Sequence, residues 1–348
     1  MRFPLADWID SHTGLRHDLA QSGMIGSIAR PRVTARELRS ATPEALRAAL
    51  ALRLGVAEAR VFLTHGATEA NAWVLWFLAR GRGGPRNSCR VAYPEYPPLF
   101  DAAQAAGFRL TRVPGPVELA VVSQPRNPEG DVWPVERLLA WATDAHHLLI
   151  DETFREFGHR RSFASLPRPG VWVTGSFTKY YAGDDLRVGY VVAPTTYARE
   201  FARFVGLVSD KVAPVSLAGA LSALAHHAVI ARRIDRFLEP NRHALVRAFP
   251  GATAPVAPVW FDRVGPAAGR LTRRLLKASV LVCPGKYFGE PNGVRLCLTR
   301  PTFPSDLEAY LAVRARFVPR GAASGGRTAA SPARRPPAGS VRARDGRA

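Results

Sequence analysis

The sequence contains very little lysine. Of its 48 basic residues, 44 are Arg and only four are Lys, and no lysine precedes Lys179. The other three are Lys211, Lys277 and Lys286. An arginine guanidinium stays protonated and cannot act as a neutral amine, whereas a lysine side chain can. Lys179 is therefore a position whose chemistry has to be explained.

Long apolar runs and cysteine pairs are also missing. No run reaches the roughly 18 apolar residues of a membrane span, and two histidines interrupt the nearest candidate, residues 217–231. The first ten residues have no apolar core, so we expect no signal peptide. Cys89, Cys283 and Cys297 show no C-x-x-C spacing. We expect reduced thiols in a cytoplasmic protein, with no metal site and no membrane contact.

The net charge of +20 is partly carried by the end of the chain. Residues 320–348 hold seven Arg and one Asp, which accounts for six of the twenty charges. This segment is rich in Gly, Ala, Ser and Pro, so we predict a disordered basic tail over 319–348. The remaining charge is spread along the chain, without the basic-aromatic clusters of a nucleic-acid surface, and an arginine-rich composition also fits a nucleotide bias in the gene. We therefore do not expect a nucleic-acid partner.

The middle of the chain alternates short apolar runs with helical patterns. With 47% hydrophobic and 22% charged residues, the composition is that of a globular protein. The predicted strands are 88–93, 108–113, 117–123, 147–152, 170–176 and 186–194, and the predicted helices are 97–107 and 134–145. Continuous Val, Ile and Leu runs separated by helices predict an α/β fold whose parallel or mixed sheet is covered on both faces.

Polar residues follow the apolar runs, where ligands bind such sheets. Asp151 comes directly after the run LLI, and the segments QPRNPEG and SFTK follow two other runs. The segment HGATEA precedes a helical pattern and is either an ordinary helix start or a seat for a phosphate. Asp151 is either a helix cap or a partner for a cationic ring nitrogen. Lys179 is either a surface lysine or a functional one, three residues after Ser176 and eight before Arg187.

Six motifs together resemble those of the fold-type-I enzymes that depend on pyridoxal 5′-phosphate (PLP), the class I/II aminotransferases. They are HGATEA, YPEYP, RNPEG, DETFREF, SFTKYYAGDDLRVGY and GVRLCLTRP, and they extend from about residue 60 to residue 301. The resemblance is closest to the branch that holds histidinol-phosphate aminotransferase and threonine-phosphate decarboxylase. It implies a large domain with a mostly parallel sheet covered by helices, a smaller α+β domain, and PLP as the cofactor.

The resemblance assigns roles around the cofactor ring. Lys179 matches the lysine that forms the Schiff base, and only an amine can do so. Asp151 matches the aspartate that keeps the pyridine nitrogen protonated, which makes the ring an electron sink. Asn127 matches the residue that hydrogen-bonds the phenolic oxygen O3′. Tyr96 matches the aromatic side chain that stacks on the ring.

Other matched residues surround the cofactor phosphate and the substrate. The residues that match the phosphate seat are Gly66, Ala67, Thr68, Ser176 and Arg187. Arg295 matches the arginine that binds the substrate carboxylate bidentately. Gly23 matches the amino-terminal glycine that lines the substrate site.

The chain also departs from the family pattern. Phe154 stands where many relatives have a tyrosine that donates to O3′, and phenylalanine at this place also occurs in the decarboxylase branch. Asp184 and Asp185 stand where small residues are usual, and they are expected to perturb the phosphate seat. We find no counterpart of the tyrosine that, in many relatives, reaches the phosphate from the partner subunit.

From these features we predict a cytoplasmic, biosynthetic aminotransferase that transfers an amino group from an L-amino acid to a 2-oxo acid through the Lys179 Schiff base. We expect a large PLP-binding domain over 32–235 and a small domain formed by 1–31 and 236–318. A homodimer is implied by the resemblance. A PLP-dependent decarboxylase and a non-catalytic PLP-binding protein are the alternatives, and the side chain of the substrate is not encoded in the motifs.

Overall fold

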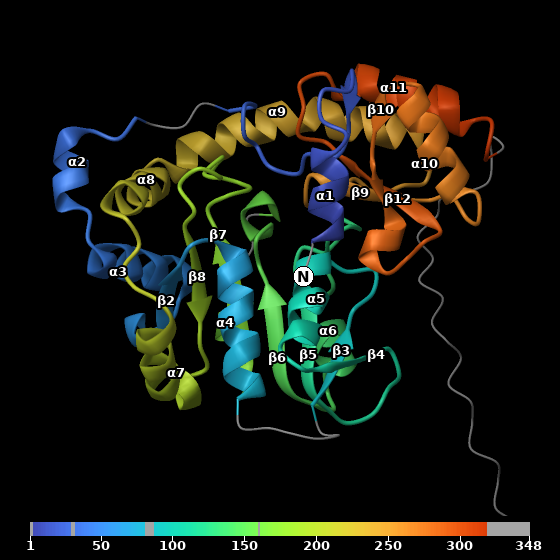
Figure 1. The fold of residues 1–348 in the computed structure, drawn as a ribbon. Helices are drawn as coiled ribbons and strands as arrows, with labels where there is room; N and C mark the ends of the chain where they lie inside the picture. The colour runs from blue at the N-terminus through green and yellow to red at the C-terminus, as the bar shows by residue number, and fades with distance from the viewer. Residues whose placement is uncertain (1–2, 29–31, 81–86, 159–160, 319–348) are drawn as a thin grey trace, which may run out of the picture.

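The computed structural model describes residues 3–28, 32–80, 87–158 and 161–318 (Figure 1). The tail predicted over 319–348 lies outside these residues. The main feature of the described chain is a seven-stranded sheet in the order β2-β8-β7-β6-β5-β3-β4. Its strands are β2 (Val61–Thr64), β3 (Ser88–Val91), β4 (Arg109–Thr111), β5 (Val117–Ser123), β6 (Ala145–Asp151), β7 (Val171–Ser176) and β8 (Gly189–Val192). Strand β8 runs antiparallel to both of its neighbours, and the other pairings are parallel.

The sheet is buried on both faces because the sequence supplies apolar residues to both. In β6, Leu149 enters one core, whereas Leu148 and Ile150 enter the other, as expected of alternating side chains. The first core is completed by α4 (Ala67–Ala79), α5 (Pro97–Ala105) and α7 (Thr195–Val208). The second includes residues of α3 (Pro43–Leu54), α6 (Val135–Trp141), α8 (Pro214–Ala225) and α9 (His227–Ala248). The predicted α/β fold with a mixed, doubly covered sheet is confirmed.

The predicted strands are present, although some are shorter than expected. The run 117–123 is reproduced as β5, whereas the run 186–194 shortens to β8. Arg187 has a φ of 48°, which is a left-handed conformation that no strand tolerates. The strand therefore begins only at Gly189.

A second group of elements packs beside the large sheet. Strands β9 (Val259–Arg263), β11 (Cys283–Pro284) and β12 (Gly293–Cys297) form an antiparallel sheet, and β1 (His17–Asp18) pairs with β10 (Val280–Leu281). The helices of this group are α1 (Pro4–Asp10), α10 (Ala268–Lys277) and α11 (Phe303–Arg314). The β1–β10 pair ties the N-terminal segment to the second half of the chain. The two-domain division stays a prediction, and its boundary at residue 235 falls inside the continuous helix α9.

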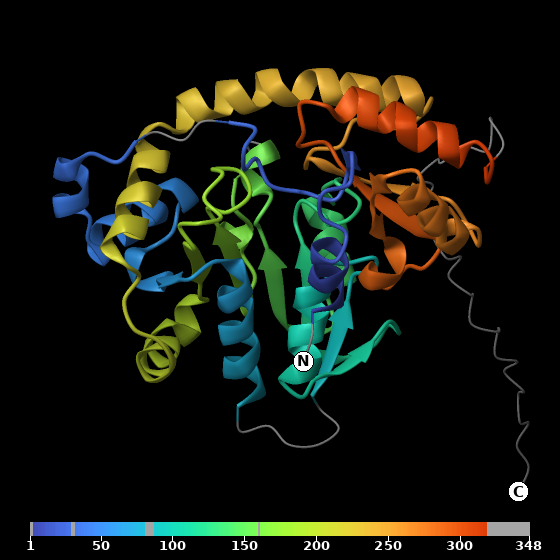
Figure 2. The same ribbon diagram turned by 45° about the horizontal axis from the view of Figure 1, so that its top comes forward.

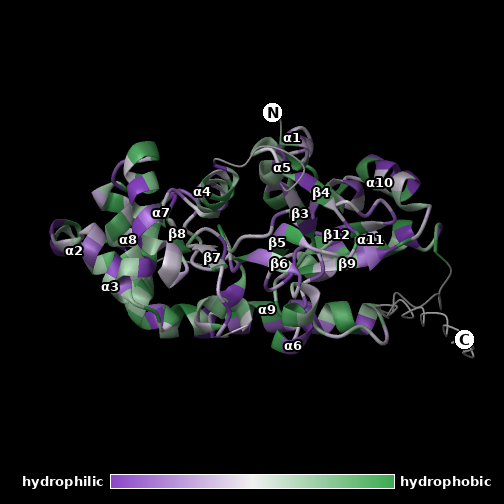
Figure 3. Cartoon of the chain, turned by 90° about the horizontal axis from the view of Figure 1, so that it is seen from below, coloured by the Kyte–Doolittle hydropathy of each residue, from purple (hydrophilic) through white to green (hydrophobic). Residues whose placement is uncertain are grey.

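Helix α9 runs along the side of both sheets (Figure 2). The remaining elements are α2 (Ala35–Ser40) and the short 3-10 helices Glu58–Arg60, Arg155–Gly158, Phe163–Ser165 and Gly285–Phe288. In Figure 3, helices such as α8 and α9 carry both hydrophobic and hydrophilic residues, as expected when one helix face is buried. Within the described residues, no single helix has the length and apolar character to cross a membrane; only α8 and α9 taken together, with a 74° bend between them, meet those criteria.

Candidate active site

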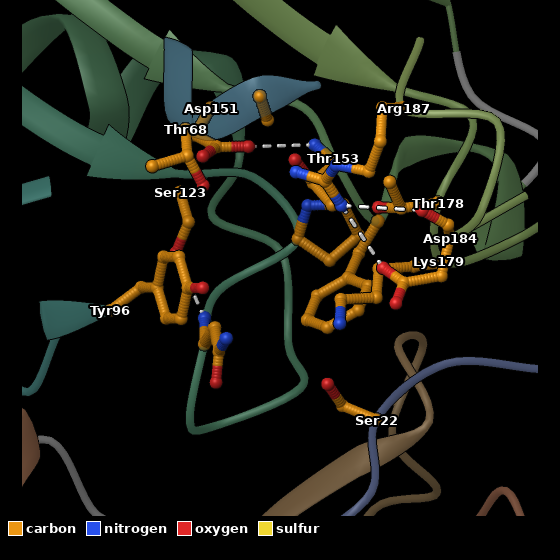
Figure 4. Close-up of a pocket in the computed structure, with 14 residues that line it drawn as sticks. Ser22, Thr68, Tyr96, Ser123, Asp151, Thr153, Thr178, Lys179, Asp184 and Arg187 are labelled. Carbon is orange, nitrogen blue, oxygen red and sulfur yellow. Dashed lines mark hydrogen bonds and ion pairs between the residues drawn. The ribbon is translucent and has the colours of Figure 1, made fainter. Parts of the chain in front are cut away.

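A cavity of about 210 Å³ lies at the carboxyl ends of β5, β6 and β7 (Figure 4). Eight of the predicted site residues line it: Ala67, Thr68, Tyr96, Asn127, Asp151, Phe154, Lys179 and Arg187. Ser22, Ser123, Pro125, Thr153, Thr178 and Asp184 complete the lining. The other four predicted residues, Gly23, Gly66, Ser176 and Arg295, each contact or adjoin a lining residue. The structure therefore brings all twelve predicted residues around one cavity.

Lys179 lies in the loop that follows β7, and its aliphatic chain is covered by the N-terminal segment. The backbone N–H of Met24 donates to the carbonyl oxygen of Lys179 at 2.9 Å. A Cβ atom on Gly23 would lie 3.4 Å from Lys179 Cδ, so a glycine leaves space beside the lysine. Burial lowers the pKa of Lys179, while the nearby Asp184 carboxylate opposes this effect. A lysine in such an environment can serve as a neutral amine nucleophile or base.

Asp151 ends β6 and is held by two donors. Asn71 Nδ2 donates to Asp151 Oδ2 at 2.8 Å, and the backbone N–H of Thr153 donates to Oδ1 at 2.8 Å. Thr174 Oγ1 in turn donates to Asn71 Oδ1 at 2.6 Å, which fixes the orientation of the amide. Burial raises the pKa of Asp151, and the bonds from Thr153 and Asn71 oppose this rise. Sequence reasoning missed Asn71; the available signal was one amide among the apolar residues that follow the first turn of α4.

A second network places Tyr96 and Asn127. Glu95 is fully buried and accepts hydrogen bonds from Ser123 Oγ at 2.5 Å, Ser123 N at 2.9 Å and Tyr96 N at 2.7 Å. The backbone N–H of Asn127 donates to Ser123 Oγ at 2.9 Å. Burial raises the pKa of Glu95 to about 7, although the nearby Arg126 opposes the rise. Neither Glu95 nor Ser123 was predicted, although Glu95 lies inside the YPEYP motif.

Arg295 lies behind Asn127 rather than on the cavity wall. Its Nη1 donates to Asn127 Oδ1 at 3.1 Å, and its Nη2 donates to the Ala20 carbonyl oxygen at 2.9 Å and contacts Cys283 Sγ at 3.1 Å. The residue is 2% exposed, and its Nε has no hydrogen-bond partner among the described residues. A buried guanidinium with spare donors beside a cavity is suited to binding a carboxylate.

Residues of the predicted phosphate seat meet where α4 begins. Gly66 has a φ of 94°, and a Cβ atom there would lie 2.8 Å from Arg187 Nη2, so the guanidinium approaches the first turn of α4 closely. Ser176 Oγ is 2.6 Å from Thr178 Oγ1, and it is Thr178 that lines the cavity. Sequence reasoning had selected Ser176 and missed Thr178, which is the lining residue of the two.

Two of the residues that depart from the family pattern, Phe154 and Asp184, line the cavity. Phe154 is 4% exposed, lines the cavity and packs edge-on against Phe157 at a centroid distance of 5.9 Å. Asp184 lines the cavity and its Oδ1 is 3.1 Å from Arg187 Nη1. Asp185 is exposed and is not among the lining residues.

Comparison with known proteins gives a consistent result. A family model described as aminotransferase class I and II matches residues 32–306. The 4-dedimethylamino-4-oxo-anhydrotetracycline transaminase OxyQ of Streptomyces rimosus is 28% identical over 74% of this chain and 78% of its own length. Capreomycidine synthase of Streptomyces vinaceus is 28% identical over 86% of this chain and 89% of its own length. Histidinol-phosphate aminotransferase 2 of Caulobacter vibrioides is 28% identical over 55% of this chain and 56% of its own length.

Solved structures share the same fold. A PLP-dependent aminotransferase from Streptococcus suis superimposes with a TM-score of 0.68 at 21% identity, covering 91% of this chain and 97% of the other. Aspartate aminotransferase from Thermus thermophilus superimposes with a TM-score of 0.73 at 20% identity, covering 90% of this chain and 94% of the other. At these identities the likeness concerns the fold alone.

Proposed function

Because the chain belongs to the class I and II aminotransferase family, we propose that it uses PLP to transfer an amino group from an L-amino acid to a 2-oxo acid. The observation that carries this proposal is the position of Lys179. Among the described lining residues it is the one amine, and the same cavity is lined by the buried carboxylate of Asp151. A pyridine aldehyde needs an amine that reacts with its aldehyde and an acidic partner for its ring nitrogen, and this cavity offers one of each.

The donor set fits PLP on three counts. Lys179 offers an amine for the aldehyde, and burial favours its neutral form. Asp151 offers a carboxylate to a pyridinium nitrogen and is oriented by Asn71. The first turn of α4 and Arg187 offer N–H donors to a phosphate. When bound, PLP supplies an electron sink for the charge that develops at the substrate Cα.

The protein groups would then handle the proton and orient the substrate. Lys179 Nζ is proposed to take the proton from the substrate Cα and return it in the 1,3-proton shift of transamination. Arg295 is proposed to bind the substrate carboxylate, supported by its burial and its unpartnered Nε. Its bond to Asn127 would link carboxylate binding to the residue that is proposed to hydrogen-bond the phenolic oxygen of PLP.

Decarboxylation is the second candidate, and Phe154 is the observation that favours it. This side chain lines the cavity where many relatives have a tyrosine, and the decarboxylase branch also uses phenylalanine there. A decarboxylase would hold the Cα–carboxylate bond, rather than Cα–H, perpendicular to the ring. Release of carbon dioxide without formation of a keto acid would identify this reaction.

The experiment that tests the proposal is a spectrum followed by mapping of the adduct. Purified protein incubated with PLP should be yellow, absorbing near roughly 420 nm, and borohydride should fix the cofactor to Lys179. Peptide mapping that finds the adduct on Lys211, Lys277 or Lys286 would contradict the assignment. An amino-acid panel, followed at the same wavelength and by keto-acid formation, then identifies the donor.

We also propose that the protein is a homodimer, as the family resemblance implies. Several large apolar side chains are exposed in the single chain and are available for an interface: Trp76, Leu207, Val208 and Val215. Light scattering at micromolar concentration would measure the mass directly. The cytoplasmic location stays a prediction from the sequence.

A further inference from the structure

The end of the cavity nearest the start of α4 holds one cation and one anion. Arg187 and Asp184 both line the cavity, and their charged atoms Nη1 and Oδ1 are 3.1 Å apart (Figure 4). Each side chain is about half exposed, at 47% and 51%. The positive charge that would attract a phosphate is therefore already offset by a carboxylate on the same loop.

We propose that Asp184 is a specificity-determining residue of the cofactor site, which lowers the preference of the site for a phosphorylated over an unphosphorylated pyridine aldehyde. The proposal rests on the proposed function, because it concerns how PLP is held. A phosphate dianion at this end of the cavity would have to share Arg187 with a like-charged carboxylate. An uncharged ligand at the same place would meet no such repulsion.

Backbone hydrogen bonds of the loop position the two residues of the pair. The N–H of Leu186 donates to the Gly183 carbonyl oxygen at 3.1 Å, and the N–H of Gly183 donates to the Phe177 carbonyl oxygen at 3.2 Å. This turn places residues 184 and 187 on the same side. Arg187 is also confined from the other side, where its Nη2 lies against Gly66.

Other nearby carboxylates do not take this position. Glu69 Oε2 accepts from the backbone N–H of His65 at 2.5 Å and is not among the lining residues. Asp151 is buried and binds Asn71 and the Thr153 N–H. Asp185 is exposed and does not line the cavity. Asp184 is thus the carboxylate that a phosphate at Arg187 would meet.

The test is equilibrium titration of the apoprotein with PLP and, separately, with pyridoxal. Three proteins are compared at one pH and low salt: the natural sequence, Asp184→Asn and Asp185→Asn. Asparagine keeps the shape of the side chain and an acceptor for Arg187 while removing the charge. Asp185→Asn is the matched control, since it removes the same charge from the next residue of the same loop.

We expect Asp184→Asn to increase the ratio of PLP affinity to pyridoxal affinity by about fivefold, with a smaller increase at 0.5 M salt. We compare ratios because the Asp184 charge also opposes the lowering of the Lys179 pKa by burial. A change in Lys179 would affect the binding of both aldehydes and would cancel in the ratio. Asp185→Asn should leave the ratio unchanged. An unchanged or lower ratio for Asp184→Asn, or an equal increase for Asp185→Asn, would overturn the inference.

The two failures can be told apart. If the natural protein binds PLP at Lys179 but Asp184→Asn fails to raise the ratio, only this inference is wrong. If neither aldehyde binds to any of the three proteins, the proposed function is wrong and this inference is overturned with it.

Discussion

Glu95 and Glu152 are two buried carboxylates that differ in the residues they bind. Both are fully buried, and burial raises the pKa of each to about 7, against the opposing charges of Arg126 and Arg155 respectively. Glu95 binds Ser123 and the Tyr96 N–H, next to the cavity. Glu152 accepts from the Phe163 N–H at 2.5 Å and from Ser162 Oγ at 3.1 Å, and neither of these partners lines the cavity. Comparing the two residues therefore separates the effect of a buried carboxylate on stability from its effect on the site.

A prediction for stability follows from these raised pKa values. The folded protein holds a proton on each carboxyl more firmly than the unfolded chain, so the stabilisation is complete below pH 4.5 and is lost as pH rises to 7. Glutamine does not titrate. The natural protein should therefore lose free energy of unfolding relative to Glu95→Gln or Glu152→Gln as the pH rises between those limits. The expected change in this difference is about 1.4 kcal/mol per pH unit. Urea unfolding at pH 5, 6, 7 and 8 measures this change.

The two glutamine variants should differ at the site. Glu95 accepts hydrogen bonds from the Tyr96 N–H, the Ser123 N–H and Ser123 Oγ. In Glu95→Gln the amide nitrogen would replace one of the accepting oxygens, so a donor would face a donor and the positions of Ser123, Tyr96 and Asn127 would be disturbed. We expect weaker PLP binding for Glu95→Gln and unchanged binding for Glu152→Gln. A stability difference that does not vary with pH, or equal effects on PLP binding, would contradict the interpretation.

Phe154 leads to a second residue-level prediction. A tyrosine hydroxyl in this part of the cavity would stabilise the phenolate of a bound PLP, provided that it reaches the oxygen. A hydrogen bond to a charged group contributes about 1.5–3 kcal/mol. Phe154→Tyr should therefore shift the titration of the visible band of the lysine-bound cofactor to lower pH by about one to two units. Phe157→Tyr is the control, because Phe157 is buried behind Phe154 and is not a lining residue. An unchanged Phe154→Tyr curve would show that residue 154 does not face the ring oxygen.

At the scale of elements, helix α4 joins two parts of the site that are separate in the sequence motifs. Its first turn contributes Ala67 and Thr68 to the cavity, and Asn71, one turn later, orients Asp151 from β6. The helix is placed so that Asn71 also meets Thr174 of β7. One helix therefore fixes Thr68 and Asp151, which are proposed to face the phosphate and the ring nitrogen of PLP, relative to each other.

Asn71 gives a prediction at this scale. Asn71→Ala removes a donor from a buried carboxylate and leaves Thr174 without its acceptor, which should destabilise the protein by about 1–3 kcal/mol and weaken PLP binding. Asn71→Asp should weaken binding further, because it places a second carboxylate against Asp151. Urea unfolding and PLP titration measure the two effects. Full retention of PLP affinity in both variants would mean that the orientation of Asp151 does not depend on α4.

The elements themselves were largely predictable, and the network between them was not. Strands β5, β6 and β7 were recognisable because burial on both faces demands continuous apolar runs, and parallel strands bring their polar ends together. Asn71 and Glu95 were not, because their partners Asp151 and Ser123 lie 80 and 28 residues away in the sequence. Such pairs arise from tertiary packing, which no local pattern encodes.

At the scale of the whole molecule, the predicted site residues come from the seven-stranded sheet, the three-stranded sheet and the N-terminal segment. Asp151 comes from the large sheet and Arg295 from β12 of the small one. The N-terminal segment lies between them: Ser22 lines the cavity, and the Ala20 carbonyl oxygen accepts from Arg295. A fragment holding either sheet alone would therefore contain only part of the site.

The last described helix, α11, sets a limit on how much of the C-terminal region can be removed. Its Tyr310 hydroxyl donates to Asp262 Oδ2 at 2.5 Å, and Arg314 Nη2 donates to Asp262 Oδ1 at 3.0 Å. Asp262 is fully buried in β9. Loss of α11 would leave a buried carboxylate without these partners, which is a severe defect.

Two truncations therefore separate the packed chain from the basic segment that follows. Removing residues 320–348 takes away seven Arg and one Asp, lowering the formal net charge from +20 to +14. Since the composition of this segment provides few apolar groups to bury, we expect a melting temperature within about 2 °C of the full chain and unchanged PLP content. Removing residues 303–348, which also deletes α11, should prevent stable folding. Calorimetry and the visible spectrum compare the three chains, and a fall of more than about 4 °C for the shorter deletion would show that residues 320–348 contribute to the packed structure.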